Sequence, residues 1–521
     1  MSYLNCGRLL RLAADRNGPR PFLTFGARTW TYAQFHQTVN RLANSLLASG
    51  VKSGDRVAIL SHNSDGVLLV LFAAARIGAV TVPLNTMLTN DEAVDLVVRS
   101  KASVLAVGSG LSGRLDGILE RVPRPRLVLQ LGEGRPESPD VVSLDELIAA
   151  SIASDEPHIA VADEDLATII FTSGSTGTPK ATAKTHANLG WSAVNLQLAE
   201  PRDRRSVELF AIPLSGIGFA NFILADVLAG AHVVLMAKFD ADEAVRLIEH
   251  HRVTHAFLAP TMLLSMAGSP ELRDGALRSV VAVDTAYEMS PEQRRSVAEC
   301  FPAADFVYGY GSTEGLLNRT PPDRFLTDPT CVGRPAGLDE TRVMTADGRL
   351  AATDEVGEIE LYGPTRMAGY LGQDDAEVFT GDGWYRTGDL GSMDEDGMLH
   401  FRGRIKDMIK SGGYNVAAAE VESAIGEVDG VRAVAVVGRS HPYWGEAVVA
   451  AVVLETEAEA DKTRRAITDH LSQRLSAYKR PKHVEMVTDL PYSPSGKVAK
   501  GVLVAALAHV FADEGARSDG G

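Results

Sequence analysis

The segment TIIFTSGSTGTPK, residues 168–180, gives the strongest local signal in this sequence. Its first four residues form a short apolar run typical of a buried strand, and a turn rich in glycine and hydroxyl side chains follows and ends at Lys180. Glycines let backbone N–H groups approach phosphate oxygens closely, and the hydroxyls and the lysine add donors and a cation. The segment is therefore suited to a polyphosphate, with a flexible loop of small residues as the alternative. It is not a Walker A loop, because Pro179 stands where that pattern requires glycine.

Short apolar runs alternate with helical patterns on the N-terminal side of this segment. Residues 56–60, 81–84 and 104–107 are typical of buried strands, and residues 67–77 and 91–99 carry helical patterns between them. Near-continuous apolar strands that alternate with helices predict parallel sheets covered by helices. The predicted fold class is therefore α/β.

The pattern changes in the last third of the chain. Residues 358–362 alternate polar and apolar side chains, as a half-exposed antiparallel strand does, and residues 391–403 predict a β-hairpin. A compact α/β segment follows Arg404. We expect a large N-terminal domain over residues 1–403, a small domain over residues 404–512 and a disordered tail over residues 513–521.

Composition excludes several classes of protein. The chain has 521 residues, 45% of them apolar and 23% charged, which is typical of a globular protein with several domains. A formal charge of −16 argues against a nucleic-acid partner, because such proteins usually present a basic face. The longest apolar run, residues 67–75, is much shorter than the ~20 residues of a membrane helix. The N-terminus shows no secretory pattern, and Cys6, Cys300 and Cys331 are too far apart to suggest a disulfide framework or a zinc site, so we expect a cytoplasmic protein without a membrane span.

Two further segments carry residues suited to a nucleotide. In VYGYGSTEG, residues 307–315, Tyr310 offers a flat face to a purine and Glu314 an oxygen ligand to Mg²⁺. An ordinary glycine-rich turn with a surface acid is the alternative. In residues 384–410, Asp389 and Arg404 together could bind the two hydroxyls of a ribose, whereas each alone would be an ordinary turn acid or surface cation.

A fourth segment, LPYSPSGKVAK at residues 490–500, presents Lys497 in a turn-rich stretch. Most lysines are solvated, so this residue means little alone. The four segments, in this order and at these separations, resemble the core motifs of the AMP-forming adenylating enzymes. That superfamily comprises acyl- and aryl-CoA synthetases, nonribosomal peptide synthetase adenylation domains and beetle luciferases. The resemblance runs from TWTYAQF, residues 29–35, to Lys497, and is strongest to the acyl-CoA synthetases.

The resemblance implies a fold and a reaction. The fold is a large N-terminal domain of parallel-rich sheets covered by helices with a small β-barrel-like subdomain, followed by a small mobile α/β domain. The reaction is ATP-dependent activation of a carboxylic acid as an acyl-adenylate, with release of pyrophosphate and then transfer to a thiol. The implied co-substrates are ATP with Mg²⁺ and CoA.

The resemblance also implies a site. Lys497, Thr313 and Glu314 would be the catalytic residues: Lys497 would bridge the substrate carboxylate and the α-phosphate, Thr313 would contact that phosphate, and Glu314 would bind Mg²⁺. The residues implied to bind ATP are Thr172, Ser173, Gly174, Ser175, Thr176, Gly177, Lys180, Asp284, Thr285, Ala286, Tyr310, Asp389 and Arg404.

The second half of the implied reaction uses the small domain. That domain would rotate about Lys406, remove Lys497 and bring a turn with Ser411, Gly412 and Gly413 toward a tunnel for the thiol. Hinges of this kind absorb backbone rotation at the edge of a domain.

This sequence departs from the commonest pattern of CoA ligases at three places. Ala181–Thr182 replace a glycine and an aliphatic residue after Lys180. Ser215 and Gly216 stand where many of these enzymes have an aromatic residue and a histidine, so together with Gly309 they are candidates for lining a pocket for the acid. The lost rings suggest a bulky acid or an altered gate, with compensated drift as the alternative.

The third departure is an acid at position 284. Asp284 could pair with an amine of the substrate or contact the adenine amino group, and a solvated loop acid is the alternative.

The acceptor of the acyl group stays open at the level of sequence. CoA is expected first, and the basic cluster at residues 479–482 could attract its phosphates, although a solvated basic turn explains that cluster as well. A carrier-protein phosphopantetheine is the second possibility, and no carrier domain follows Lys497. An unusual oxyanion as substrate, or an amine as acceptor, is the third.

Overall fold

Three sheets organise the chain. The computed structural model describes residues 3–134, 136, 138–151, 153–172, 179–286, 289, 291–411, 414–441, 443–455, 460–492 and 498–511. In the largest sheet of this described part the strand order is β17-β18-β20-β21-β16-β15-β14-β13-β12-β10-β11-β1-β2. Its strands are β1 (Pro21–Phe25), β2 (Arg28–Thr31), β10 (Val207–Phe210), β11 (His232–Leu235), β12 (His255–Phe257), β13 (Ala282–Thr285), β14 (Asp305–Ser312), β15 (Gly315–Arg319), β16 (Cys331–Pro335), β17 (Glu340–Met344), β18 (Gly357–Tyr362), β20 (Tyr385–Met393) and β21 (Leu399–Arg404).

The second sheet has the order β19-β9-β8-β4-β3-β5-β6-β7. Its strands are β3 (Arg56–Leu60), β4 (Val80–Leu84), β5 (Val104–Gly108), β6 (Leu127–Leu131), β7 (Val142–Ser143), β8 (Leu166–Thr172), β9 (Lys180–Thr185) and β19 (Gly369–Tyr370). β3 through β8 pair in parallel, as their apolar runs predict, whereas β8 and β9 form an antiparallel hairpin around the glycine-rich segment.

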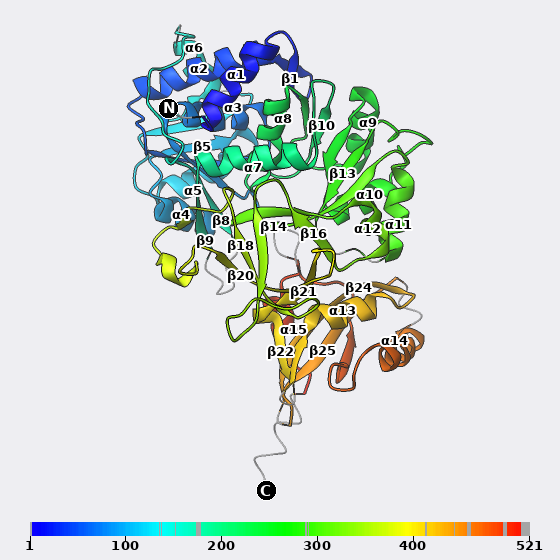
Figure 1. Cartoon of the computed structure of the whole chain (residues 1–521). Helices are drawn as coiled ribbons and strands as arrows, with labels where there is room; N and C mark the ends of the chain where they lie inside the picture. Colours follow the sequence, from blue (N-terminus) through cyan, green and yellow to red (C-terminus); the bar gives the residue numbers. More distant parts are fainter. Residues whose placement is uncertain are drawn as a thin grey trace.

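A layer of helices lies between these two sheets (Figure 1). It consists of α1 (Cys6–Asn17), α2 (Tyr32–Ala48), α3 (Asp65–Ile77), α6 (Leu144–Ala150), α7 (His186–Ala199), the π-helical turn η2 (Phe219–Ile223) and α8 (Leu224–Ala229). Their buried side chains join those of β1 and β11 from one sheet and β3 and β5 from the other in a single core. The edge-to-face rings of Phe22, Phe35 and Phe72 lie at its centre.

Helices also cover the outer face of each sheet. Those on the largest sheet are α9 (Ala241–His251), α10 (Pro260–Ala267), α11 (Pro291–Cys300) and α12 (Pro322–Thr327), and those on the second sheet are α4 (Asn90–Ser100), α5 (Leu115–Leu119) and the 3₁₀ turn η1 (Ser109–Arg114). The predicted α/β class with helix-covered, parallel-rich sheets is therefore confirmed.

α3 illustrates how local sequence sets an element. The Ser64 side chain accepts a hydrogen bond from the Val67 N–H and so caps the helix, and Asp65 places a negative charge at its positive end. Gly78 ends the helix at φ +72°, and a Cβ there would approach the Ser53 hydroxyl to 2.6 Å. The buried helix that results supports the parallel strands β3 and β4.

The other end of the largest sheet is antiparallel and curls. β15 contacts β18 and β16 contacts β17 across the curl, which gives the barrel-like shape that the resemblance implies. β20 and β21 form the predicted hairpin, and their register places Asp389 opposite Arg404. The 3₁₀ turn η3 (Asp375–Glu377) lies between β19 and β20.

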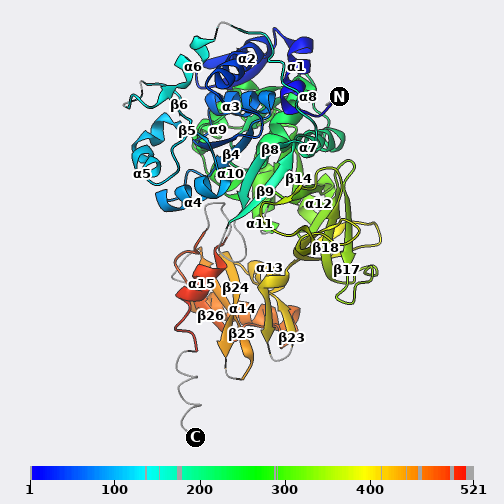
Figure 2. The same ribbon diagram turned by 90° about the vertical axis from the view of Figure 1, so that its left-hand side faces the viewer.

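The third sheet follows the 3₁₀ turn η4 (Ile405–Asp407) and lies below the two larger sheets in Figures 1 and 2. Its strands are β22 (Met408–Ser411), β23 (Tyr414–Ala417), β24 (Val431–His441), β25 (Gly445–Leu454) and β26 (His483–Met486). α13 (Ala418–Gly426) and α14 (Ala460–Arg474) pack on one face and α15 (Lys500–Ala506) on the other. Within the described residues, every helix is too short or too polar to cross a membrane.

Candidate active site

The glycine-rich segment begins and ends at two paired residues. Thr172, the last residue of β8, lies opposite Lys180, the first residue of β9. The Thr172 hydroxyl is 3.5 Å from Glu314 Oε1, and Lys180 Nζ lies 4.6 Å from the centre of the Tyr370 ring. Residues 173–178, which include the predicted phosphate ligands Ser173, Gly174, Ser175, Thr176 and Gly177, lie outside the described residues, so their roles stay predictions.

Glu314 lies in the turn between β14 and β15. Its side chain is only 8% exposed, so the alternative of a surface acid is wrong. The Tyr370 hydroxyl donates to Glu314 Oε1 at 2.7 Å and lies 3.3 Å from the Tyr385 hydroxyl. Burial, followed by the charge of Glu314, raises the pKa of both tyrosines, so both hydroxyls keep their protons.

The turn that carries Glu314 depends on a glycine. Gly315 has φ +154°, and a Cβ at this position would lie 2.8 Å from the Arg366 Cα. The Glu314 carbonyl accepts a hydrogen bond from the Met367 N–H at 2.6 Å, which ties the turn to the segment before β19. Thr313, half-buried beside Glu314, lies in the same turn.

Tyr310, Asp389 and Arg404 form a second group. The Tyr310 hydroxyl donates to Asp389 Oδ2 at 2.9 Å, and Arg404 Nε lies 3.1 Å from Asp389 Oδ1. Burial and then the charge of Asp389 raise the pKa of Tyr310 well above its usual value. The structure thus brings together three residues that were predicted to bind a nucleoside, and neither Asp389 nor Arg404 is an isolated charge. The Tyr385 hydroxyl contacts that of Tyr370 in the first group, and burial followed by the charges of Glu314 and Asp389 raises its pKa.

Asp284, Thr285 and Ala286 lie at the carboxyl end of β13. The Asp284 carboxylate is 3% exposed and lies 2.6 Å from Nη1 of Arg319, and burial raises its pKa to about 6. The alternative of a solvated loop acid is therefore wrong, and the carboxylate already has a cationic partner. Thr285 is fully buried and its hydroxyl has no hydrogen-bond partner, whereas Ala286 is half-buried at the strand end.

Two small cavities lie near this site. The first, of about 20 Å³, is mostly apolar and includes Gly216 and Ile217 in its wall. The second, of about 10 Å³, shares Ile217 and is lined by polar residues beside Glu314. The predicted pocket residue Gly216 therefore lines a cavity. Ser215, in the same turn, and Gly309, buried in β14, belong to neither wall.

Sequence reasoning missed Lys184 and Tyr370. Lys184, in β9, is 1% exposed, and its Nζ donates to the carbonyls of Thr365 at 2.6 Å and Glu314 at 3.4 Å. Burial lowers its pKa to about 8, against the opposing effects of Glu314 and Asp339. A lysine within an otherwise small-residue strand was the available signal for Lys184. Tyr370 lies in a two-residue strand and offered none.

The predicted hinge lies close to two of the residues predicted to bind ATP, Arg404 and Lys180. Lys406, in η4, is exposed, and its pKa is lowered by partial burial and by the neighbouring charges of Arg404 and Lys180. Ser411 is buried at the end of β22 with no hydrogen-bond partner for its hydroxyl. Gly412, Gly413 and Lys497 lie outside the described residues, although the bridge between Tyr492 and Val498 places the two ends of the Lys497 segment side by side.

The residues present fit a magnesium nucleotide. Mg²⁺ prefers oxygen ligands, and Glu314 Oε1 and the Thr172 hydroxyl supply two of them next to the cation of Lys180. Tyr310, Asp389 and Arg404 supply a ring, a carboxylate and a guanidinium at the adjoining position.

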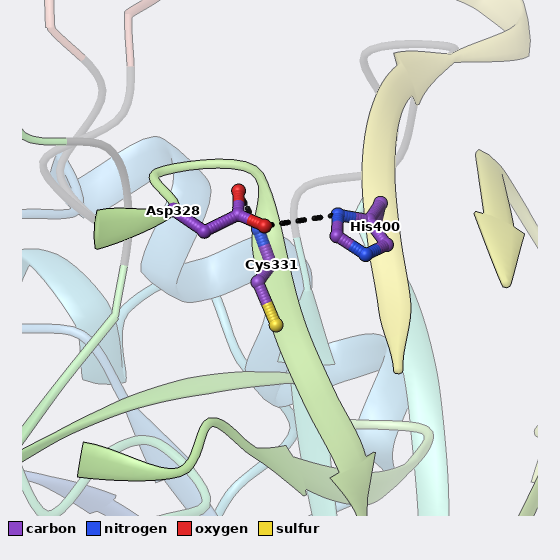
Figure 3. A group of neighbouring side chains, drawn as sticks. All are labelled: Asp328, Cys331 and His400. Atoms are coloured by element: carbon purple, nitrogen blue, oxygen red, sulfur yellow. Dashed lines mark hydrogen bonds and ion pairs between the residues drawn. The ribbon is translucent and has the colours of Figure 1, made fainter. Parts of the chain in front are cut away.

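Figure 3 shows a second polar group. Asp328, Cys331 and His400 bring one potential ligand atom each to within 4.8 Å of one another, a grouping that the cysteine spacing did not predict. The imidazole already lies between two carboxylates, at 3.5 Å from Asp328 and 3.0 Å from Asp394, and the thiol in Figure 3 turns away from that contact. We interpret the group as a link between the β20–β21 hairpin and the segment before β16.

Comparison with known proteins identifies the family. Residues 10–371 match the AMP-binding enzyme family, and residues 420–497 match the C-terminal domain of AMP-binding enzymes. A feruloyl-CoA synthase of Amycolatopsis sp is 35% identical over 481 residues, which are 91% of this chain and 94% of that protein. An indoleacetate–CoA ligase of Aromatoleum aromaticum is 34% identical over 484 residues, 92% of this chain and 93% of that one. The crystal structure of ATP-bound MatB from Rhodopseudomonas palustris, 28% identical, superposes with a TM-score of 0.86 and covers 97% of this chain and 99% of its own. This chain belongs to the AMP-binding enzyme family.

Proposed function

We propose that this protein is an AMP-forming acid–CoA ligase: it joins AMP to a carboxylic acid and then transfers the acyl group to the thiol of CoA. The observation that carries the proposal is the convergence of the motif residues. The hydroxyls of Thr172 and Tyr370 meet Glu314, although these residues come from separate segments of the chain. In a second group, the Tyr310 hydroxyl and Arg404 meet Asp389. The names of the relatives support CoA as the acceptor.

The nucleotide is bound by residues of known chemistry. Asp389 and Arg404 bind the ribose, because the carboxylate accepts from its hydroxyls and the guanidinium donates to them. Tyr310 stacks on adenine. Thr172, the glycine-rich segment and Lys180 bind the β- and γ-phosphates, which leaves the α-phosphorus next to Thr313.

The first half-reaction forms one bond and breaks one. A carboxylate oxygen of the acid attacks the α-phosphorus, and the bond from that phosphorus to pyrophosphate breaks. No general base is needed, because the acid is already ionised above a pKa of ~4–5. Lys497 stabilises the negative charge that spreads over the carboxylate and the α-phosphate. Bound at Glu314, Mg²⁺ supplies further charge neutralisation at the phosphates.

The second half-reaction requires the small domain to move. We divide the chain into a large domain of residues 1–403 and a small domain of residues 404–512, with Lys406 as the hinge. Rotation removes Lys497 and brings Ser411, Gly412 and Gly413 toward the path of the thiol. The thiol releases its proton to water, its sulfur bonds to the acyl carbon, the bond from that carbon to the phosphate oxygen breaks, and AMP leaves.

The test measures the two half-reactions separately. Purified protein with magnesium ATP and a panel of carboxylic acids should exchange labelled pyrophosphate into ATP, and no exchange with any acid would overturn the proposal. Offering CoA, a phosphopantetheinylated carrier protein or an amine then identifies the acceptor, and thioester formation with CoA is the expected result. We propose the cytoplasm as the compartment, because all three cysteines are free thiols.

A further inference from the structure

One short segment contacts both the backbone and the side chain of Glu314. The Met367 N–H donates to the Glu314 carbonyl at 2.6 Å, and the Tyr370 hydroxyl donates to the Glu314 carboxylate at 2.7 Å. Both contacts come from residues 363–370, which we call the anchor segment. The position of the anchor segment therefore sets where the Glu314 carboxylate lies.

β9 holds one end of the anchor segment by ordinary strand pairing. Gly369 and Tyr370, which form β19, pair with two residues of β9. The Ala368 N–H adds a hydrogen bond to the Ala183 carbonyl at 2.9 Å. These bonds fix the Tyr370 end, but the residues before Ala368 lie outside the pairing, so other contacts must hold them near Glu314.

Lys184 supplies such a contact from the same strand, β9. It is 1% exposed, and its Nζ donates to the Thr365 carbonyl at 2.6 Å and to the Glu314 carbonyl at 3.4 Å. An ammonium group has three N–H donors, so it can bind carbonyls of two segments at once. This single group therefore bridges the anchor segment and the turn that carries Glu314.

An acid holds the same threonine. The Thr365 hydroxyl donates to Asp339 Oδ2 at 2.7 Å, and the Thr365 N–H donates to Asp339 Oδ1 at 3.3 Å. Asn188 of α7 adds a hydrogen bond from its Nδ2 to the Pro364 carbonyl at 3.1 Å. The carbonyl, the N–H and the hydroxyl of Thr365 are thus all engaged, which fixes the backbone of the anchor segment at this point.

The charge of Lys184 is the costly part of this arrangement. Taking an ammonium group out of water is unfavourable unless other charges compensate for it, and here the carboxylates of Glu314 and Asp339 do so. An apolar side chain of similar length would fill the same space without that cost. Such a side chain would lack the two hydrogen bonds, so what the ammonium group contributes beyond packing is the position of the two carbonyls.

We propose that Lys184 is a positioning residue for the magnesium site: it holds the anchor segment against the Glu314 turn and so sets where the Glu314 carboxylate meets Mg²⁺. The inference rests on the proposed function, because it concerns the metal that Glu314 binds in that reaction. Lys184 acts through the Glu314 carbonyl and is not itself a ligand of the nucleotide.

The test compares ATP binding with and without magnesium, measured by calorimetric titration of the whole protein. Lys184→Met removes the donors but keeps a long unbranched side chain. Binding of magnesium ATP should weaken about tenfold, because residues that orient a metal ligand contribute to metal affinity on that order. Binding of ATP in EDTA should stay within about twofold of wild type, because the ribose residues Asp389 and Arg404 lie outside this bridge.

Thr182→Val is the matched control. Thr182 is buried in the same strand, and its hydroxyl has no hydrogen-bond partner within the described part of the chain, so both affinities should stay at their wild-type values. The double variant Lys184→Met/Asp339→Asn leaves no charge on Asp339 without its cation. It should show the same selective loss, and it provides the measurement if the single variant does not fold.

Unchanged affinity for magnesium ATP in the folded variant would overturn the inference alone. An equal loss of affinity with magnesium and with EDTA would also overturn it, because a lysine that only supports the fold would not act selectively on the metal. Absence of ATP binding by the wild-type protein would overturn the proposed function and the inference with it.

Discussion

A single side chain, Lys497, supplies the charge that the proposed first half-reaction needs. Replacing Lys497 by alanine should reduce pyrophosphate exchange about 10²–10³-fold, because charge that develops at the α-phosphate loses its stabilisation. Transfer of a pre-formed acyl-adenylate to CoA should be affected much less, because the lysine has left the site by then. Lys500→Ala is the control: Lys500 lies three residues away and pairs with Glu422 at 2.8 Å within the small domain. Near-normal exchange in Lys497→Ala would reject the assigned role.

The Tyr370 hydroxyl is a second residue whose role can be isolated. It donates to Glu314 Oε1 at 2.7 Å, and hydrogen bonds to charged groups contribute about 1.5–3 kcal/mol. Tyr370→Phe should therefore lower kcat/KM for magnesium ATP by about 10–100-fold, with a smaller effect on the KM for the acid. Tyr385→Phe removes the neighbouring hydroxyl, 3.3 Å from that of Tyr370, and should cost less. An unchanged kcat/KM in Tyr370→Phe would show that Tyr370 acts only through packing, because phenylalanine keeps the ring.

At the scale of elements, the short turn η4 (Ile405–Asp407) connects β21 of the largest sheet to β22 of the third sheet. Residues 291–411 are described without a gap, and within them η4 is the only connection between these two strands. Lys406→Pro fixes φ near −65° and removes an N–H, so rotation about this residue is restricted. We expect thioester formation to slow at least about tenfold while pyrophosphate exchange stays within about twofold. Lys406→Ala, which removes the side chain but leaves the backbone free, separates the hinge from the charge. If Lys406→Pro slows both half-reactions equally, the hinge assignment is wrong.

The elements themselves could largely be predicted from sequence. The strand at 56–60 matches β3 residue for residue, and the helix expected at 67–77 begins only two residues earlier, because apolar runs and a serine cap are local signals. The hairpin at 391–403 was equally visible, and it aligns Asp389 with Arg404.

What sequence could not provide is the pairing of distant segments. Thr172 and Glu314 are 142 residues apart, and Tyr370 reaches the same carboxylate from a two-residue strand, so no local pattern links them. Lys184 appeared to be an ordinary strand residue, and its burial depends on loops that arrive from elsewhere in the chain. The motifs therefore identified residues that the structure brings together in two groups, whereas the cavities beside them could not be predicted.

At the scale of the whole molecule, a buried network of charges joins the largest sheet to the helix layer that packs on it. Arg202 lies 3.0 Å from Glu200, 3.3 Å from Glu208 and 3.4 Å from Asp226, which come from the α7–β10 loop, β10 and α8. Arg319 extends the network, because it pairs with both Glu200 and Asp284. With Asp284 the network holds four carboxylates and two guanidiniums, and burial with the nearby Arg202 lowers the pKa of the adjoining His255 to about 4, which leaves that ring neutral. The carboxylates therefore compete for too little positive charge.

This imbalance makes stability depend on pH. Burial, only partly offset by Arg202, raises the pKa of Glu208 from 4.5 to about 7, so between these values the folded protein binds a proton that the unfolded chain releases. The free energy of unfolding should consequently fall as pH rises from about 5 to 7.5. In the Glu208→Gln variant this side chain has no titratable proton. Its free energy of unfolding should therefore fall by about 1–3 kcal/mol less over the same pH range. The control is Glu360→Gln, which removes a buried carboxylate of the same sheet that pairs with Arg342 outside the network. Denaturant unfolding at several pH values measures the difference, and parallel curves for wild type and Glu208→Gln would mean that the proton resides elsewhere in the network.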